Sequence, residues 1–425
     1  MQGLPETPDN LGPFDLVVAG GGYAGMCAAI SAARDGLRVA LIQNRPVLGG
    51  NASSEIAVPL RGQIPADGPY PLLGRTVSQL QYDAHDDARM ATAADDAHHE
   101  QVVRAEENVT LLLNHHAYAV EMDNERIAAV LALDTRTNAR KRIAGRLFAD
   151  CTGHGTIGVL AGADYEMAGA EDIVMGMTNK WDWEVTDAPQ PFPITPWALD
   201  LDVGDFPRTS GHGGWNWESG YYRNPIADLE YIRDWNLRAV FGAWNALKNC
   251  GGAKEHANAR LTRVAYVGGT RESRRLLGDV ILSEDDMLNR VEFDDGFVPV
   301  TWYLDRHHPH PDFAHKYPDD PFIAQGGHKP GTRREDRPRH GEPWWGIPYR
   351  CLYSRNVPNL FMAGRDISTT LWALGAVRVM RTGGMMGEVV GQAARICMEK
   401  NCTPREVYQD HLELLQKRFT GEVPR

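Results

Sequence analysis

A short glycine-rich turn between two apolar segments constrains this chain more than any other feature. Leu16–Ala19 is an apolar run too short for a helix, and glycines follow it directly, which predicts a buried parallel strand. The pattern Gly20-x-Gly22-x-x-Gly25 then leads into an alanine-rich helical segment, and Arg38–Gln43 predicts a second strand. A strand, a glycine turn, a helix and a strand in this order predict a dinucleotide-binding unit.

Each glycine of the turn has its own predicted role. Gly20 permits the tight turn, Gly22 lets backbone amides approach a pyrophosphate, and Gly25 lets the helix pack close to the strand. The pyrophosphate would lie at the N-terminus of the helix, where unpaired N–H groups and the macrodipole favour negative charge.

Gln43 departs from the usual pattern at the end of the second strand. An Asp or Glu about 20 residues beyond the glycines usually holds the ribose hydroxyls. The oxygen of the Gln43 amide can still accept such a bond, but without the charge that strengthens it. An ordinary strand-end residue is the alternative, and the nearby Arg45 leaves open a phosphorylated ribose, as in NADP.

Length and charge limit the class of protein. A chain of 425 residues that is 43% hydrophobic can fill the cores of two or three domains. The formal net charge of −12 argues against a nucleic-acid partner. The six cysteines contain no C-x-x-C pair, so neither a disulfide framework nor a zinc site is predicted. Met1–Phe14 has no signal-peptide pattern and no apolar run is long enough to span a bilayer, so we expect a cytoplasmic protein without a membrane partner.

Residues 109–150 predict four consecutive strands, followed by a second glycine turn. The turn is Cys151–Gly155, directly after a buried strand, and such a turn brings backbone close to a cofactor. A simple strand-to-helix turn is the alternative. The four predicted strands are Val109–Leu113, Ala117–Met122, Arg126–Leu133 and Arg142–Asp150.

Residues 168–340 differ in composition and predict a separate substrate domain. Leu229–Lys248 is an amphipathic helix, and Gly326–His340 is a basic, glycine- and proline-rich segment typical of a mobile loop. Aromatic side chains in this region either stack on sugar rings and other flat ligands or fill a core. The candidates are Trp181, Trp183, Trp197, Trp215 and Trp217.

The C-terminal part returns to regular structure. Asn359–Asp366 predicts a strand that ends in a glycine turn, and Gly375–Cys397 predicts a helix rich in small residues. This pair would complete the first sheet. The predicted fold class is therefore α/β, with a Rossmann-like domain formed by residues 14–167 and 341–400, an inserted α+β substrate domain at 168–340, and a helical tail at 401–425.

Several blocks resemble a known family. They are Ala40–Glu55, Arg271–Asp279, Ile347–Arg355 and Arg378–Met380. From Asp15 to about Ala394 the chain is similar to the FAD-dependent oxidoreductases that share the glutathione-reductase type of FAD-binding fold, and more narrowly to a bacterial family of FAD-dependent oxidoreductases. The resemblance implies FAD as the cofactor. Gln43 is a familiar residue at its position in that family, so the resemblance makes NADP a less favoured cofactor.

The resemblance also implies which residues hold FAD. The helix that begins near Gly383 would point its N-terminus at the flavin pyrimidine edge and stabilise the negative charge of the reduced flavin. The family more often has Asp where this chain has His154, and Asn where it has Asp366. The implied residues are Gly20, Gly22 and Gly25 for the pyrophosphate; Gln43, Asn44 and Arg45 for the adenosine ribose; Gly49, Gly50 and Asn51 for the pyrophosphate or ribityl chain; and Gly153, Gly364, Arg365, Asp366, Gly383 and Gly384 in the later motifs.

Two polar clusters supply catalytic candidates. Thr301–His315 carries four histidines in loop-like surroundings that align them on no strand or helix face, which favours proton transfer over metal binding. Arg271–Arg275 is either an anion clamp or an ion-pair cluster. A neutral histidine is the natural base near pH 7, so we predict His310 in that role with His308 as its rival. The predicted substrate-orienting groups are Arg271, Arg274 or Arg275, with Glu272 fixing them.

These features favour an enzyme that passes a hydride from a hydroxyl carbon of a sugar, polyol or sugar-like acid to flavin N5. One alternative is a fumarate-reductase-like enzyme that acts on a C–C bond of a carboxylate substrate. Another is a flavin- or RNA-binding module without turnover, which the acidic charge disfavours. The sequence predicts a small-molecule substrate and no metal. It names no electron acceptor and leaves a homo-oligomer open.

Overall fold

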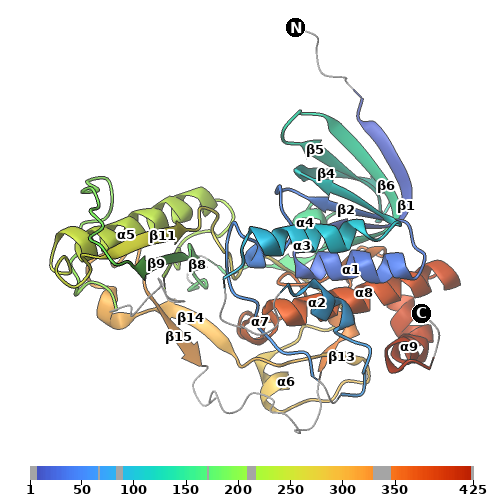
Figure 1. The fold of residues 1–425 in the computed structure, drawn as a ribbon. Helices are drawn as coiled ribbons and strands as arrows, with labels where there is room; N and C mark the ends of the chain where they lie inside the picture. Colours follow the sequence, from blue (N-terminus) through green and yellow to red (C-terminus); the bar gives the residue numbers. More distant parts are fainter. Residues whose placement is uncertain are drawn as a thin grey trace.

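A mixed sheet forms the centre of the larger unit of the protein (Figure 1). The structure is a computed structural model that describes residues 7–65, 68–82, 90–169, 172–207, 217–328 and 346–422. The strands are β1 (Asp9–Ala19), β2 (Val39–Gln43), β3 (Val109–Leu113), β4 (His115–Asp123), β5 (Arg126–Asp134), β6 (Arg140–Asp150) and β17 (Leu360–Met362). Their order is β3-β2-β1-β6-β5-β4, and β17 also pairs with β6.

The sheet combines a parallel and an antiparallel part. β3, β2, β1, β6 and β17 run parallel, whereas β4, β5 and the first part of β6 form an antiparallel meander. The strands predicted over residues 109–150 are confirmed to within two residues at each end. The Rossmann-like α/β fold is therefore confirmed, while the glutathione-reductase type stays a prediction.

Two helices lie side by side on one face of this sheet. They are α1 (Tyr23–Arg34) and α8 (Met380–Lys400). A Cβ on Gly387 would lie 2.0 Å from the Ala24 carbonyl oxygen, and one on Gly391 would lie 2.7 Å from the Ser31 Cβ. Residues later in α1 therefore contact residues later in α8, so the two helices run parallel and their N-termini lie at the same end.

Other helices of the larger unit pack against this pair or against the sheet (Figure 1). They are α2 (Arg75–Leu80), α3 (Ala93–Arg104), α4 (Thr156–Leu160) and α9 (Pro404–Thr420), of which α9 is the predicted helical tail. α2 and α9 pack against the pair, α3 packs against α2 and β3, and α4 packs against β4 and β6. The single helix predicted at 375–397 is two helices, α7 (Leu371–Val377) and α8. Among the helices of the described ranges, none is long and apolar enough to cross a membrane.

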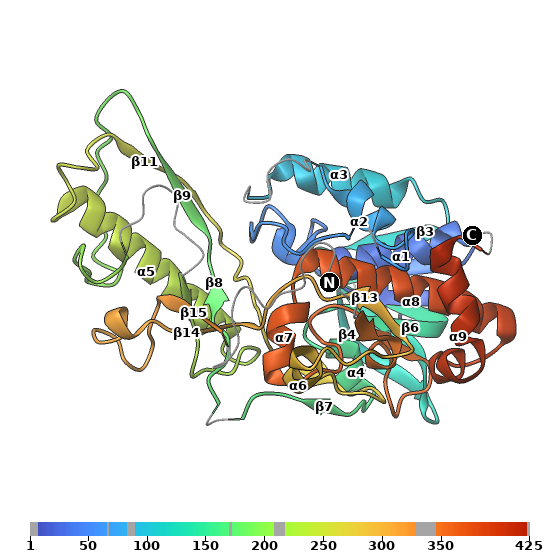
Figure 2. The same cartoon turned by 90° about the horizontal axis from the view of Figure 1, so that it is seen from below.

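A second lobe stands apart from the sheet, and α7 lies at its junction with the larger unit (Figures 1 and 2). It contains α5 (Leu229–Asn249), which confirms the predicted amphipathic helix. Its strands are β8 (Met177–Thr178), β9 (Trp181–Val185), β10 (Glu218–Ser219), β11 (Ala259–Val264), β14 (Asp305–Pro309) and β15 (Ala324–His328).

The lobe has its own core, and tryptophans fill much of it. Trp181, Trp217 and Trp244 are buried there, with Trp183 packed against them. The interpretation of Trp181 and Trp217 as ligand-stacking surfaces is therefore wrong, because no face of either ring is open. Trp197 is 52% exposed, and Trp215 lies outside the described residues.

Packing divides the middle of the chain between the two units. The short elements β12 (Arg275–Leu276), α6 (Glu284–Leu288) and β13 (Gly296–Pro299) contribute to the core of the larger unit. Hydrophobic packing thus assigns this stretch to the sheet-containing unit, while the predicted boundaries at 168 and 340 stay predictions. The loop predicted at 326–340 falls largely outside the described residues, and its beginning belongs to β15.

Candidate cofactor and active site

The first glycine turn packs against two neighbouring segments. Gly20 has φ +104°, and a Cβ there would lie 2.2 Å from the Cys151 carbonyl oxygen. A Cβ on Gly25 would lie 1.8 Å from the carbonyl oxygen of Gly20. These two positions therefore require glycine for packing between β1, α1 and the second glycine turn, as the sequence predicts.

Other glycines face one another, backbone to backbone. The nearest atom to a Cβ on Gly22 would be the Gly50 Cα, 3.9 Å away, and for Gly383 it would be the Gly364 Cα, 3.7 Å away. We call these four residues the glycine cradle. The nearest side chain to any of these positions is Ala24, whose Cβ would lie 3.4 Å from a Cβ on Gly364. The cradle is therefore lined by backbone and a small side chain, which suits a slim group that runs along bare backbone, as a pyrophosphate does.

Two helix N-termini meet at this cradle. In the described residues, neither α1 nor α8 has a side-chain N-cap or an acidic residue in its first turn. The neighbouring α3 has both, in a complete capping box. The buried Oγ1 of Thr382, in the first turn of α8, also has no hydrogen-bond partner among the described residues. In α8 the Arg381 N–H donates to the Arg61 carbonyl at 3.0 Å, which is a neutral backbone partner. Two positive helix ends without a charged cap at one place suit an anion, so the chain fits the diphosphate of a dinucleotide.

Gln43 connects the first glycine turn to the loop after β2. Its Oε1 accepts a hydrogen bond of 2.9 Å from the Gly21 N–H, and its Nε2 donates to the Val47 carbonyl, also at 2.9 Å. Gln43 is buried and Asn44 is exposed. Arg45 makes a two-pronged pair with Glu55, at 2.6 and 2.8 Å. The structure therefore gives Gln43 and Arg45 protein partners, and their contacts with a ribose stay predictions.

The carbonyl of Thr270 joins two of the cofactor segments. It accepts hydrogen bonds from Asn51 Nδ2 at 2.9 Å and from Arg365 Nη1 at 2.8 Å. Burial lowers the pKa of Arg365 to about 10. The loop after β2, the segment before β12 and the turn after β17 therefore meet here, although they are far apart in the sequence.

Asp366 braces the second glycine turn. Its Oδ2 accepts from the Gly153 N–H at 3.1 Å and from the Gly155 N–H at 3.3 Å. Burial, and then the neighbouring Asp150 carboxylate, raise the pKa of Asp366. His154 in the same turn lies 3.0 Å from the Ser273 hydroxyl, and burial lowers its pKa to about 3. Asp366 thus acts on the backbone of the turn, and its predicted contact with FAD stays untested.

A buried chain of alternating charges lies where the two lobes meet. Glu218 on β10 pairs with Arg271 at 2.6 Å and with His307 Nδ1 at 2.8 Å. The other ring nitrogen of His307 lies 3.3 Å from Asp305 Oδ1, and the Oδ2 of Asp305 lies 3.2 Å from Arg378 Nη2. We call these five residues the charge chain.

The charge chain favours the protonated form of His307. Burial disfavours the imidazolium, but Glu218 and Asp305 outweigh burial and raise the pKa of His307. Both ring nitrogens are engaged by carboxylates, so His307 is a poor candidate for a base that takes a proton. Burial likewise disfavours the carboxylate of Asp305, yet its bonds to His307 and Arg378 hold its pKa well below the usual range.

The other predicted orienting groups also have protein partners. Arg271 donates to the Gly176 carbonyl at 2.9 Å in addition to its pair with Glu218. Glu272 accepts from the Met175 N–H at 3.1 Å and lies 3.8 Å from Arg306, and burial raises its pKa. Arg275 donates to the Thr369 carbonyl at 2.9 Å, and Arg274 lies over the ring of the exposed Tyr165. Their roles toward a substrate stay predictions.

Two of the four histidines of residues 301–315, His307 and His308, lie on the strand β14, which corrects the prediction of a loop for that part of the segment. Alternation along β14 places Asp305 and His307 on one face and Arg306 and His308 on the other. Arg306 and His308 both lie near the Trp372 ring of α7, at 5.6 and 5.9 Å from its centre. Among the described residues, no group of His, Cys, Asp and Glu has the arrangement of a metal site.

His310 lies beyond the end of β14 and faces its own lobe. Its Nδ1 accepts from the Asp312 N–H at 3.2 Å and caps a short turn, and its ring packs 4.8 Å from that of Phe313. Its backbone N–H donates to the Ile323 carbonyl. The two predicted rivals are therefore separated, because His308 contacts α7 of the larger unit and His310 does not.

Sequence reasoning predicted Arg271 as a site residue but missed the other four members of the charge chain, and Lys180 as well. The missed members are Glu218, Asp305, His307 and Arg378, and no spacing in the chain reveals how their segments pair. Lys180 is 3% exposed, and burial, followed by the nearby Arg271, lowers its pKa to about 7. The two-residue spacing of Asp305 and His307 was the one available signal, because it would place both on one face of a strand. The surrounding prolines favoured a loop instead.

Together, the parallel sheet, the glycine cradle and the paired helix N-termini define a dinucleotide-binding protein of Rossmann type with a charged site beside a second lobe. A family model described as FAD dependent oxidoreductase matches residues 15–181 and 206–419. The chain belongs to this family: it is a flavoenzyme, and its cofactor is FAD.

Solved structures add distant similarities. A geranylgeranyl bacteriochlorophyll reductase-like protein from Thermoplasma acidophilum is 14% identical at a TM-score of 0.45, over 97% of this chain and 85% of that one. A triple mutant of a flavin-dependent brominase is 12% identical at 0.40, over 93% and 84%. A myxobacterial chondrochloren halogenase is 14% identical at 0.38, over 97% and 79%. These likenesses are too distant to assign an activity to this chain, and no curated protein matches it.

Proposed function

We propose that this oxidoreductase oxidises a hydroxyl carbon of a sugar, polyol or sugar-like acid, and that His308 takes the hydroxyl proton. The observation that carries the proposal is the position of His308 on β14 against Trp372. Trp372 belongs to α7, which leads directly into α8 and the glycine cradle. Of the two histidines predicted as the base, His308 is the one in contact with the cofactor-binding unit.

The protonation state of His308 suits a base. Burial, and then the positive charges of Arg306 and His307, lower its pKa, so its imidazole is neutral at pH 7. A neutral imidazole can accept a proton while a C–H bond breaks. His307, one residue earlier, is held protonated, so the two faces of β14 provide one charged and one neutral imidazole.

Each part of the chain has a distinct task in this proposal. Bound FAD supplies the hydride acceptor at N5. The charge chain fixes β14 relative to α7, because Arg378 follows α7 and donates to both the carbonyl and the carboxylate of Asp305, at 3.1 and 3.2 Å. His308 takes the proton, and Arg306 beside it carries positive charge that favours a developing alkoxide.

The structure gives less support to a carboxylate clamp for C–C bond chemistry. The guanidinium of Arg271 is engaged by Glu218 and by a backbone carbonyl, and Arg275 is engaged by a carbonyl and by Glu166. A substrate carboxylate would have to displace these partners. We therefore do not propose the fumarate-reductase-like alternative.

Anaerobic reduction of the bound flavin tests the proposal. A panel of sugars, polyols and sugar acids is mixed with the holoenzyme while flavin absorbance is followed, and unsaturated acids are tested as oxidants of the reduced enzyme. With an active substrate, His308→Gln should slow flavin reduction by at least about 100-fold. His310→Gln is the matched control and should change the rate by less than about threefold, since its ring only caps a turn.

Two results would count against the proposal. Reduction by no member of the hydroxyl panel, together with reoxidation by an unsaturated acid, would favour the C–C chemistry. An unchanged reduction rate in His308→Gln would leave hydroxyl oxidation in place but remove His308 from the reaction.

A further inference from the structure

We infer that Cys397 and Cys402 form a dithiol pair that a hydroperoxide oxidises reversibly to a disulfide, at a pocket far from the glycine cradle. The inference does not depend on the substrate of the flavin site. It rests on a pocket, a pair of adjacent thiols and the positive charge around them.

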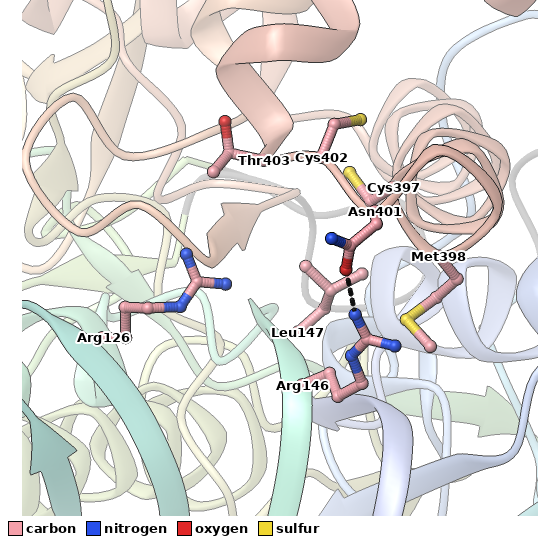
Figure 3. A pocket seen from close by; sticks show the side chains of 8 residues that line it. All are labelled: Arg126, Arg146, Leu147, Cys397, Met398, Asn401, Cys402 and Thr403. Carbon is pink, nitrogen blue, oxygen red and sulfur yellow. Dashed lines mark hydrogen bonds between the residues drawn. The ribbon is translucent and has the colours of Figure 1, made fainter.

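The pocket lies at the C-terminal end of α8 (Figure 3). Its volume is about 250 Å³, which admits a small peroxide or a short alkyl hydroperoxide. From Cys397 to Gly383 the helix extends about 21 Å, so the pocket is separate from the cofactor site. It is lined by Arg126, Arg146, Leu147, Cys397, Met398, Asn401, Cys402 and Thr403.

The end of α8 brings the two thiols together. Asn401 has φ +53°, and the Cys402 N–H donates to the Cys397 carbonyl at 3.0 Å, which is the 6→1 bond of a Schellman motif. That motif places the side chains of these two positions in contact. Both cysteines line the pocket, and Figure 3 shows their side chains at this end of α8.

The two thiols differ in a way that suits a reactive and a resolving cysteine. Cys397 is 2% exposed, and burial raises its pKa, so it stays a thiol. Cys402 is partly exposed at the pocket. The neighbouring Cys397 thiol lowers the pKa of Cys402, against burial and the carboxylates of Glu406 and Asp410, which raise it.

Two guanidinium groups face the same pocket. Arg146 donates to Asn401 Oδ1 at 2.7 Å, and Arg126 lies on the other side of Leu147 (Figure 3). Positive charge near a partly exposed cysteine favours the thiolate, which is the form that attacks peroxides. An accessible thiolate next to a resolving thiol is the arrangement typical of cysteines that oxidise reversibly.

The chemistry balances with a hydroperoxide as the oxidant. The Cys402 thiolate attacks the terminal oxygen, the O–O bond breaks, and the alkoxide leaves as the alcohol after taking a proton. The Cys397 thiol then attacks the sulfenic sulfur of Cys402, the S–S bond forms, and the hydroxyl leaves as water with the thiol proton. Two thiols are oxidised by two electrons, the peroxide is reduced by two, and a dithiol reductant reverses the change.

The test uses the full-length holoenzyme treated with tert-butyl hydroperoxide at pH 7.5 and then alkylated. Trypsin cleaves after Lys400 and Arg405, so the disulfide appears as the linked peptides Ile396–Lys400 and Asn401–Arg405, which dithiothreitol separates. We expect this species to form with the loss of two thiols per chain. The exposed Cys250 is the matched control, and Cys402 should react at least about tenfold faster than Cys250.

Variants separate the roles of the two cysteines. In Cys397→Ser the sulfenic acid of Cys402 should persist and be trapped by dimedone, and in Cys402→Ser no adduct should form. Arg126→Gln, an exposed change, should slow the oxidation about threefold or more. Oxidation of Cys250 as fast as Cys402, or loss of thiols without the linked peptides, would overturn the inference.

Discussion

Replacing Glu218 by Gln removes one charge from the centre of the charge chain and should destabilise the protein strongly. The Glu218 side chain is fully buried, and those of Arg271 and His307 are 7% and 10% exposed, so neither cation can turn to water without moving its segment. Breaking a buried pair by removing one partner costs about 3–5 kcal/mol, because the other charge stays buried without compensation. We expect a loss of this size in the free energy of unfolding at pH 6.

The effect should depend on pH in a definite direction. The pKa of folded His307 is raised, so its stabilising contribution is fully present below its ordinary value of about 6.5 and is lost as the pH rises through the raised pKa. Glu218→Gln removes the principal partner of the imidazolium. The difference in the free energy of unfolding between wild type and variant should therefore be largest near pH 6 and smaller near pH 8.5.

Urea unfolding followed by tryptophan fluorescence measures both effects, since Trp217 is adjacent in the chain to Glu218. Glu184→Gln is the matched control, because Glu184 is 49% exposed and pairs with the exposed Arg260. That change should cost less than about 1 kcal/mol. A loss below about 1 kcal/mol in Glu218→Gln, or a loss that grows with pH, would refute the reasoning.

Three further predictions follow from the described contacts. Gly383→Val should fill the glycine cradle and weaken FAD binding by at least about tenfold (1.4 kcal/mol) in a flavin fluorescence titration, while the circular dichroism spectrum stays the same. The control Gly204→Ala, with no atom near its Cβ, should leave both FAD binding and the spectrum unchanged. Asp366→Asn should lower the free energy of unfolding in urea by less than about 1 kcal/mol at pH 7, and the variant should become more stable than the wild type as the pH rises. The reason is that the raised pKa of Asp366 shows that the fold favours its neutral form; a large loss of unfolding free energy at pH 8.5 would contradict this. Lys248→Met should lower the free energy of unfolding by about 1–3 kcal/mol, because Lys248 Nζ donates to the carbonyls of His256, Ala257 and Ala259 at 2.6–3.0 Å. The control Lys254→Met, on an exposed side chain, should not change it measurably.

The sequence predicted the cofactor-binding unit well because its signals are local. Leu16–Ala19 and the glycines after it carry their strand, turn and helix in consecutive residues, and the strands of residues 109–150 are short apolar runs between turn residues. The motif also predicted the separate roles of Gly20 and Gly25, which prove to be packing positions. It did not reveal that Gly22 faces Gly50 and that Gly383 faces Gly364, because these contacts join distant parts of the chain.

The charged site could not be predicted because its members come from separate segments. Glu218, Arg271, His307 and Arg378 pair across four elements, and no spacing in the chain encodes such contacts. The histidines of residues 301–315 were recognised as a group. The placement of His307 and His308 on opposite faces of a strand depended on β15, which pairs with β14 and makes that segment extended.

A crystal structure of the protein with FAD tests the account most directly. It should place the pyrophosphate against the backbones of the glycine cradle, about 3 Å from amides at the N-termini of α1 and α8, with the flavin ring toward α7 and His308. A pyrophosphate outside this cradle, or a flavin ring directed away from Trp372 and His308, would contradict it.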